Sequence, residues 1–315
     1  MLKYQKRAAA AVGAATLALS LAACGGGDEG GEGSVSGSVT VDGSSTVYPM
    51  SVAAQELVNE EHPSVKVSVA ESGTGGGFEK FCAGETDISD ASRPIKDEEK
   101  TACESGSIDY TELHVATDAL TVAVHPDLAV DCLTVDQLVA LFGPKATATN
   151  WNQIDPSFPD QKISLYIPGT DSGTYDYMAA DVVGDDSETL RSDVESSEDD
   201  NILVQGISGT KGAVGFFGYS YYEENQDSLK ALQIDSGDGC IAPSADTARD
   251  GTYTPLARPL FIYVKNASYT DSEATKAYVD FYIDNLPSIA EAAQFIPLSD
   301  EDYTSTKDAL AGIGG

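Results

Sequence analysis

The sequence predicts an α/β fold with mainly parallel sheets. Three stretches, at residues 39–58, 65–82 and 163–183, share one order: alternating apolar residues, a loop of small residues, and apolar residues at helical spacing. Strands that alternate with helices in this way form parallel sheets covered by helices. The chain has 315 residues, of which 41% are hydrophobic, so it can bury the core of one large or two ordinary domains.

The first stretch predicts a strand at Val39–Val41, a loop at Gly43–Thr46 and a helix that contains Pro49 in its first turn. The helix ends at His62-Pro63, because proline cannot continue it. Its apolar residues at helical spacing are Met50, Ala53, Ala54, Leu57 and Val58.

The second stretch predicts a strand at Val65–Val69, a loop at Ser72–Gly77 and a helix that contains Phe78, Phe81 and Cys82. A short strand follows at Asp87–Ala91 and ends at Ser92-Arg93-Pro94. The third stretch repeats the order with a strand at Ile163–Ile167, a loop at Pro168–Thr174 and a helix at Tyr175–Val183.

The three loops have the composition of an anion site. Ligands of α/β sheets bind beyond the carboxyl ends of the strands, where loops enter helices. Helix N-termini present free N–H groups there, glycine allows close approach, and Ser and Thr add hydroxyl donors. Ser and Thr also cap helices, so one such loop alone fits a structural role. Three of them on one chain favour ligand binding.

The N-terminal segment predicts an export signal. Lys3, Lys6 and Arg7 precede an apolar run that ends at Leu21-Ala22-Ala23-Cys24. This end resembles the lipobox of bacterial lipoproteins, in which the cysteine is lipidated and becomes residue one; an ordinary signal peptide is the alternative. We therefore expect a signal peptide at 1–23, a lipid on Cys24 and a flexible Gly/Ser/acidic tether at 24–37.

The chain is strongly acidic, with 51 Asp and Glu against 18 Lys and Arg and a net charge of −33. Removal of residues 1–23 takes away three positive charges and no acidic ones, so the mature charge is −33 − 3 = −36. This charge argues against nucleic acid and anionic membrane surfaces as partners. A small anion buried in a cleft is still compatible with it, because exposed charges are screened over about 8–10 Å.

Four cysteines remain if Cys24 carries lipid. In an exported protein an even number suggests disulfides, and four cysteines allow three connectivities. We favour Cys82–Cys103 and Cys132–Cys240, because cysteines close in the chain often pair. Zinc is the rival, but the sequence has no CxxC and only three histidines, so no metal or cofactor is expected.

Several motifs resemble one family. The motifs are the segments Gly43–Pro49, Glu71–Phe78, Asp87–Pro94, Pro168–Thr174 and Ser197–Asn201. Together they resemble the phosphate-binding proteins of the high-affinity phosphate ABC transporter, over about residues 38–315. The resemblance implies a two-lobed periplasmic-binding-protein fold of type 2, each lobe a mostly parallel sheet flanked by helices. Lobe one would be 38–118 plus 256–315, and lobe two 119–255, with crossings near 115–125 and 250–262.

The resemblance also implies a function. A monomeric receptor, lipid-anchored on the extracytoplasmic face of the cell membrane, would bind inorganic phosphate between its lobes and deliver it to the permease without catalysis. The implied phosphate-binding residues are Ser45, Thr46, Thr74, Gly75, Ser172, Gly173 and Thr174. A receptor for another tetrahedral oxyanion such as sulfate is the alternative. An exported phosphohydrolase is a further one, although no cluster of metal ligands or activated nucleophile is evident.

The sequence departs from the family pattern at two places. Pro168 stands where better-known members have an arginine, and Ser92 stands where they have an aspartate. We expect Ser92 and the neighbouring Arg93 to bind phosphate as well. Arg93 would supply the positive charge, with a structural salt bridge as its alternative role. The missing aspartate would accept the proton of hydrogen phosphate and repel sulfate, so Asp90 and Asp171 become the candidate acceptors.

Overall fold

The computed structural model describes residues 35–314 except Asp171 and residues 185–188. The expected signal peptide, the lipidated Cys24 and most of the tether at 24–37 therefore lie outside the described residues. Among the residues that are described, no helix is both long and apolar enough to cross a membrane.

The strands are β1 (Gly37–Gly43), β2 (Val65–Glu71), β3 (Ile88–Ala91), β4 (Tyr110–Val124), β5 (Cys132–Thr134), β6 (Ser164–Pro168), β7 (Glu195–Ser197), β8 (Ala213–Gly218), β9 (Lys230–Ala231), β10 (Gln233–Asp235), β11 (Cys240–Ile241) and β12 (Ala257–Lys265). The helices are α1 (Tyr48–Glu61), α2 (Gly73–Cys82), α3 (Asp97–Ser105), α4 (Val135–Phe142), α5 (Gly173–Tyr177), α6 (Asp200–Gly209), α7 (Tyr219–Asn225), α8 (Ala245–Arg249), α9 (Asn266–Asp271), α10 (Glu273–Asp284), α11 (Leu286–Ala292) and α12 (Asp300–Ala311). A 3₁₀ turn spans Trp151–Gln153, and a π-helical segment, Met178–Val183, continues α5.

The predicted strand–loop–helix units form the parallel parts of the main sheet. Its strand order is β2-β1-β3-β12-β4-β8-β6-β7, with β9 also paired to β4. β1 pairs in parallel with β2 and β3, and β6 pairs in parallel with β7 and β8. The long strands β4 and β12 pair antiparallel to each other. The α/β fold class that the sequence predicts is confirmed.

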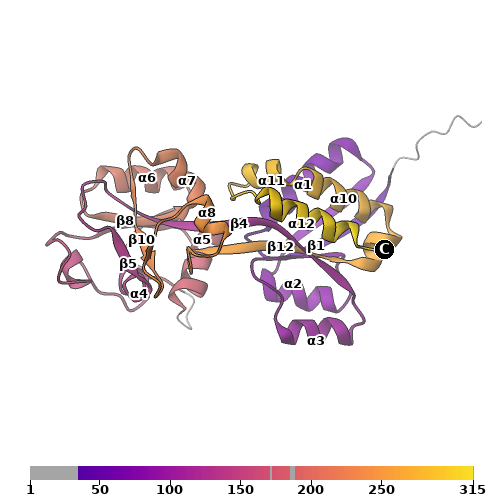
Figure 1. Ribbon diagram of the computed structural model, residues 1–315, viewed down its shortest axis with the longest axis horizontal. Helices are drawn as coiled ribbons and strands as arrows, with labels where there is room; N and C mark the ends of the chain where they lie inside the picture. Colours follow the sequence, from indigo (N-terminus) through magenta and orange to yellow (C-terminus); the bar gives the residue numbers. More distant parts are fainter. Residues whose placement is uncertain (1–34, 171, 185–188, 315) are drawn as a thin grey trace, which may run out of the picture. The chain divides into compact units, whose positions relative to one another are not determined.

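β4 and β12 join two separate hydrophobic cores (Figure 1). Up to Ala119, β4 pairs with β12, and from Leu120 onward it pairs with β8. One core contains Met50, Leu260 and Tyr278, all fully buried, and α1, α10 and α11 cover it. The other contains side chains from β4, α4, β6 and β8. The described residues therefore form two lobes, consistent with the two-lobed expectation.

The boundaries of the second and third units differ from the prediction. α2 already begins at Gly73, so most of the loop predicted at Ser72–Gly77 is helical. The third unit differs less. The strand ends at Pro168 rather than Ile167, and the helix begins at Gly173 and changes to π-helical geometry at Met178. Proline is tolerated at the end of a strand, because there the missing N–H breaks no interior ladder bond. Pro168 therefore closes β6 and is not part of a loop.

Both predicted disulfides are present and confirm the favoured pairing. Cys82–Cys103 joins the end of α2 to α3 in the first lobe. Cys132–Cys240 closes a small sheet of β11, β10 and β5 in the second lobe. The first bond anchors α2, the helix that contains the glycine-rich segment with the predicted ligand residues Thr74 and Gly75.

Candidate functional site

Residues from both lobes line one cavity of about 520 Å³, which we call the interlobe cavity. It contains side chains or backbone from Ser44, Ser45, Thr46, Gly73, Thr74, Gly75, Ser92, Arg93, Asp176, Tyr177, Asp181 and Arg258. A smaller adjoining cavity of about 180 Å³ shares Ser45 and Thr46 with it and also contains Gly173 and Thr174. Eight of the nine predicted phosphate-binding residues thus line these two cavities.

The first loop presents its hydroxyl groups because Ser44 holds its turn. The Ser44 side chain is buried, and its Oγ accepts hydrogen bonds from the backbone N–H groups of Thr46 at 3.2 Å and Val47 at 3.4 Å. Ser45 is exposed and lines both cavities. The hydroxyl groups of Ser45 and Thr46 are therefore displayed at the head of α1.

Two of the predicted ligand residues, Thr74 and Ser92, are hydrogen-bonded to each other. The backbone N–H of Ser92 donates to Oγ1 of Thr74 at 3.2 Å, and the two hydroxyl oxygens are 3.1 Å apart. Only one of the two hydroxyl protons is used in the contact between the side chains. The other proton has no acceptor among the described residues, so this pair can donate one hydrogen bond into the interlobe cavity.

The loop of the second lobe lies close to the first. Ser172, the ninth predicted residue, caps α5: its Oγ accepts from the N–H of Thr174 at 3.2 Å. A Cβ atom placed on Gly173 would lie 3.4 Å from Oγ1 of Thr46. The backbone of Gly173 in the second lobe therefore lies close to the Thr46 side chain of the first lobe.

Arg258 is the cation that sequence reasoning missed. It lies on β12 opposite Asp118 of β4, and its Nε donates to that carboxylate at 3.2 Å. Nη1 donates to Asp181 at 3.0 Å, Nη2 donates to Oγ1 of Thr46 at 2.9 Å, and the guanidinium carbon is 3.7 Å from the Tyr177 ring centroid. The only sequence signal was its rarity, because arginine is scarce in this acidic chain.

Arg93 lines the interlobe cavity but is engaged elsewhere. Its Nη1 and Nη2 donate to the two carboxylate oxygens of Glu99 at 2.8 and 2.7 Å. Bidentate pairs of this kind are strong and orient the guanidinium. The structural salt bridge that the sequence left open is therefore present, and the bonds to Glu99 and Pro94 leave Nε and one N–H of Nη2 for a ligand.

The structure does not place Asp90 in either cavity, which corrects the expectation that it is a direct acceptor. Its carboxylate is fully buried in the core of the first lobe, where it accepts from the Ser51 hydroxyl at 2.8 Å. Burial raises the pKa of Asp90 to about 7. The two positions differ because Asp90 lies within β3, whereas Ser92 follows the end of the strand at Ala91, and only Ser92 reaches the cavity. Asp171 lies outside the described residues.

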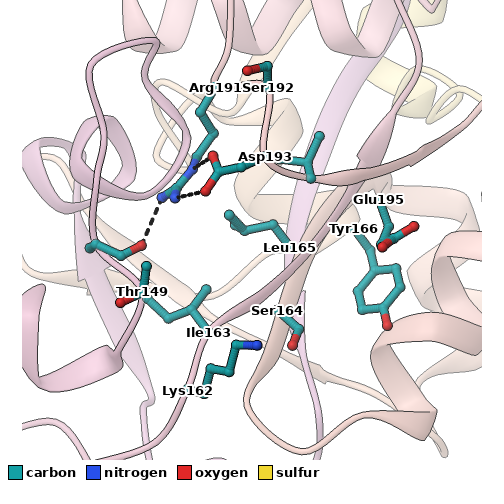
Figure 2. A pocket seen from close by; sticks show the side chains of 12 residues that line it. Thr149, Lys162, Ile163, Ser164, Leu165, Tyr166, Arg191, Ser192, Asp193 and Glu195 are labelled. Carbon is teal, nitrogen blue, oxygen red and sulfur yellow. Dashed lines mark hydrogen bonds and ion pairs between the residues drawn. The ribbon is translucent and has the colours of Figure 1, made fainter.

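Another cavity of about 400 Å³ lies in the second lobe and contains none of the predicted ligand residues (Figure 2). Its buried Arg191 donates from Nε and Nη2 to Asp193 at 2.7 Å each, while Nη1 bonds backbone carbonyls. Arg191 is therefore engaged in structural contacts. Within the described part of the chain, no group of three His, Cys, Asp or Glu side chains could hold a metal ion.

Comparisons with known proteins identify the family. Residues 29–285 match the model of the PBP superfamily domain. The chain is 46% identical to Protein SphX of Synechococcus elongatus, over 85% of this chain and 79% of that protein. It is 39% identical to the phosphate-binding protein PstS of Staphylococcus haemolyticus, over 99% of this chain and 97% of that protein.

A solved structure supports the same assignment. A possible phosphate-binding protein from Planctomyces limnophilus superposes with a TM-score of 0.85 at 38% identity, over 90% of this chain and all of that one. Fold, lobes and the loops at the interlobe cavity agree with this likeness. The chain belongs to the PBP superfamily and, within it, to the family of phosphate-binding proteins that contains PstS.

Proposed function

We propose that this protein binds inorganic phosphate in the interlobe cavity and delivers it to the permease of an ABC importer. The observation that carries the proposal is the convergence of hydroxyl groups, glycine-rich backbone and Arg258 from both lobes on one cavity. Such a cavity can stabilise an anion with little formal charge, because N–H and O–H dipoles are oriented before the ligand arrives. The family membership supports phosphate as that anion.

The donors come from separate segments of the chain. Thr46 uses its oxygen to accept from Arg258, so its own O–H proton is available to phosphate. The Thr74–Ser92 pair offers one further proton, and Gly75 and Gly173 allow the backbone to come close. In this proposal Arg258 is the main cation, and Arg93 contributes through the part of its guanidinium that Glu99 leaves unbonded.

Phosphate must compete with one carboxylate for Arg258. The Asp118 side chain is 8% exposed and stays with the guanidinium, whereas the Asp181 side chain is 56% exposed. Solvent can take over the hydrogen bonds of Asp181 at small cost, as for other exposed ion pairs. We therefore propose that phosphate replaces Asp181 at Nη1 of Arg258.

The lobes in this proposal are residues 38–118 plus 256–315 and residues 119–255. Closure would bend β4 and β12, which join the two cores, and would bury phosphate between the lobes. The closed monomer would then dock on the permease and release the ion without any covalent step.

The location in this proposal is the outer face of the cell membrane. A lipid on Cys24 and the tether at 24–37 would hold the folded body near the permease. The two disulfides support an oxidising, extracytoplasmic compartment, because cytosolic thiols are kept reduced.

Calorimetry with phosphate, arsenate and sulfate tests the proposal. We expect tight phosphate binding, weaker sulfate binding, and no turnover of a chromogenic phosphate ester. Tight sulfate binding without phosphate binding would favour the alternative receptor for another tetrahedral oxyanion, and turnover of the ester would favour a phosphohydrolase. No binding of any of the three ions would contradict the receptor function itself.

A further inference from the structure

Asp200 places a carboxylate beside the predicted ligand residues Gly173 and Thr174. It is the first residue of α6, it is half-buried, and it lines the adjoining cavity together with Thr46, Gly173 and Thr174. Thr46, Gly173 and Thr174 of the proposed phosphate site thus share a space of about 180 Å³ with two acidic side chains, Asp118 and Asp200. That volume corresponds to roughly six waters, since one water occupies about 30 Å³ of the liquid.

The Asp200 carboxylate has no hydrogen-bond or ion-pair partner among the described residues. The other carboxylate in the same cavity, Asp118, is bonded to Arg258. Asp199, the neighbour in the chain, is occupied as the helix cap: its Oδ1 accepts from the backbone N–H of Asn201 at 3.0 Å. Asp200 is therefore the acceptor in this cavity that a ligand can still use.

We propose that the Asp200 carboxylate accepts the proton of bound hydrogen phosphate and thereby distinguishes phosphate from sulfate. The inference rests on the proposed function and assigns the acceptor that Ser92 cannot supply. Hydrogen phosphate carries an O–H donor that can satisfy the carboxylate. Sulfate has no such proton at neutral pH, so its oxygens would face an unpaired negative group, which is costly in a cavity shielded from water.

The burial of Asp200 and the charges around it determine the pH range in which its carboxylate can accept a hydrogen bond from the ligand. Burial, followed by the nearby Asp199 and Glu198, raises the pKa of Asp200 to about 6. Asp118 of β4 and Tyr221 of α7 also line the cavity, and Asp118 is paired with Arg258. Asp200 is consequently a carboxylate at pH 7.5 and becomes protonated as the pH falls below 6.

The substitution Asp200→Asn tests the proposal, with Asp199→Asn as a matched control. Both remove one negative charge from adjacent positions, and asparagine is as good a helix cap as aspartate. For each folded variant, calorimetry at pH 7.5 gives the ratio of phosphate affinity to sulfate affinity. We expect this ratio to fall tenfold or more for D200N and less than threefold for D199N. A smaller fall for D200N, or an equal fall for D199N, would overturn the proposal.

A second measurement needs only the unaltered protein. If sulfate binds only when Asp200 takes up a proton, its affinity should rise as the pH is lowered from 8 toward about 6 and then level off. A sulfate affinity that does not change over this range would overturn the role of Asp200. Absence of phosphate binding by the unaltered protein would instead contradict the proposed function, so the two failures are distinguishable.

Discussion

Nη2 of Arg258 donates a hydrogen bond to the hydroxyl oxygen of Thr46 at 2.9 Å, across 212 residues of sequence. The bond connects strand β12, which joins the two lobes, to the first ligand loop at the head of α1. The same guanidinium also contacts Asp118 and Asp181. One side chain therefore links the joining strands, both lobes and the proposed phosphate site.

Replacing Arg258 with lysine should weaken phosphate binding strongly. Lysine keeps the charge, but its single ammonium group cannot bond Asp118, Thr46 and phosphate at once, as the planar guanidinium of arginine can. We expect a loss of about ten- to a hundredfold in affinity, equivalent to about 1.4–2.8 kcal/mol, measured by calorimetry. Arg249→Lys is the matched control, because Arg249 bonds the Pro297 carbonyl and lines neither cavity. Equal affinities for the Arg258 variant and the unaltered protein would rule out this role.

Arg93→Ala should have a smaller effect than loss of Arg258. Glu99 accepts from both Nη groups of Arg93 and Pro94 accepts from Nη1, so Nε, one N–H of Nη2 and the long-range charge are left to act on phosphate. We expect a loss of about threefold to tenfold, or about 0.7–1.4 kcal/mol. An unchanged dissociation constant would show that Arg93 is purely structural. A loss larger than that of the Arg258 variant would show that Arg93, as expected from the sequence, is the main cation.

The glycine run before Phe78 has a structural role besides ligand binding. A Cβ atom on Gly77 would lie 2.5 Å from the Cα of Gly43, so α2 packs directly on the backbone of β1. Gly77→Ala should lower the free energy of unfolding by about 1–3 kcal/mol, as overpacking does elsewhere. In the control Gly209→Ala the new methyl group meets nothing within 4 Å, and the change should be neutral or slightly stabilising. Urea denaturation measures both, and similar stabilities would refute the close packing.

The sequence predicts local features of this protein well, because each depends on neighbours in the chain. The alternation of Val65, Val67 and Val69 and the helix that ends at His62 are of this kind, and both are observed. The hydrogen bond between Arg258 and Thr46 could not be predicted from neighbouring residues in the sequence. It depends on the pairing of β12 with β4, which brings together segments that are distant in the chain.

Asp200 shows how precisely the start of a helix must be known before the role of a single residue can be predicted. The acidic run around it predicts a helix cap, and the cap is indeed present at Asp199. Which of two adjacent aspartates caps the helix and which faces the cavity depends on the residue at which α6 begins. A shift of one residue exchanges the two roles, and helix starts are not predictable from sequence to that precision.

The buried Asp90 should make stability depend on pH. Its pKa of about 7 in the folded protein exceeds the value of about 3.9 in an unfolded chain, because burial favours the neutral acid. Its contribution is therefore complete below pH 4 and is lost as the pH rises through 7. Between pH 5 and pH 8 we expect the unaltered protein to lose about 2–3 kcal/mol more unfolding free energy than Asp90→Asn. Equal pH dependences in urea denaturation would contradict a buried neutral acid.

Added salt should accelerate phosphate capture, because the acidic surface repels an incoming anion. The chain carries a net charge of −33, and the expected mature form carries −36. At 10 mM salt the Debye length is about 30 Å and the surface charges act together on the ion, whereas at 1 M it is about 3 Å. We therefore expect the association rate constant in stopped-flow measurements to rise several-fold between these conditions. A rate that falls as salt is added would mean that the positive field of Arg258 at the cavity entrance outweighs the acidic surface and steers the ion inward.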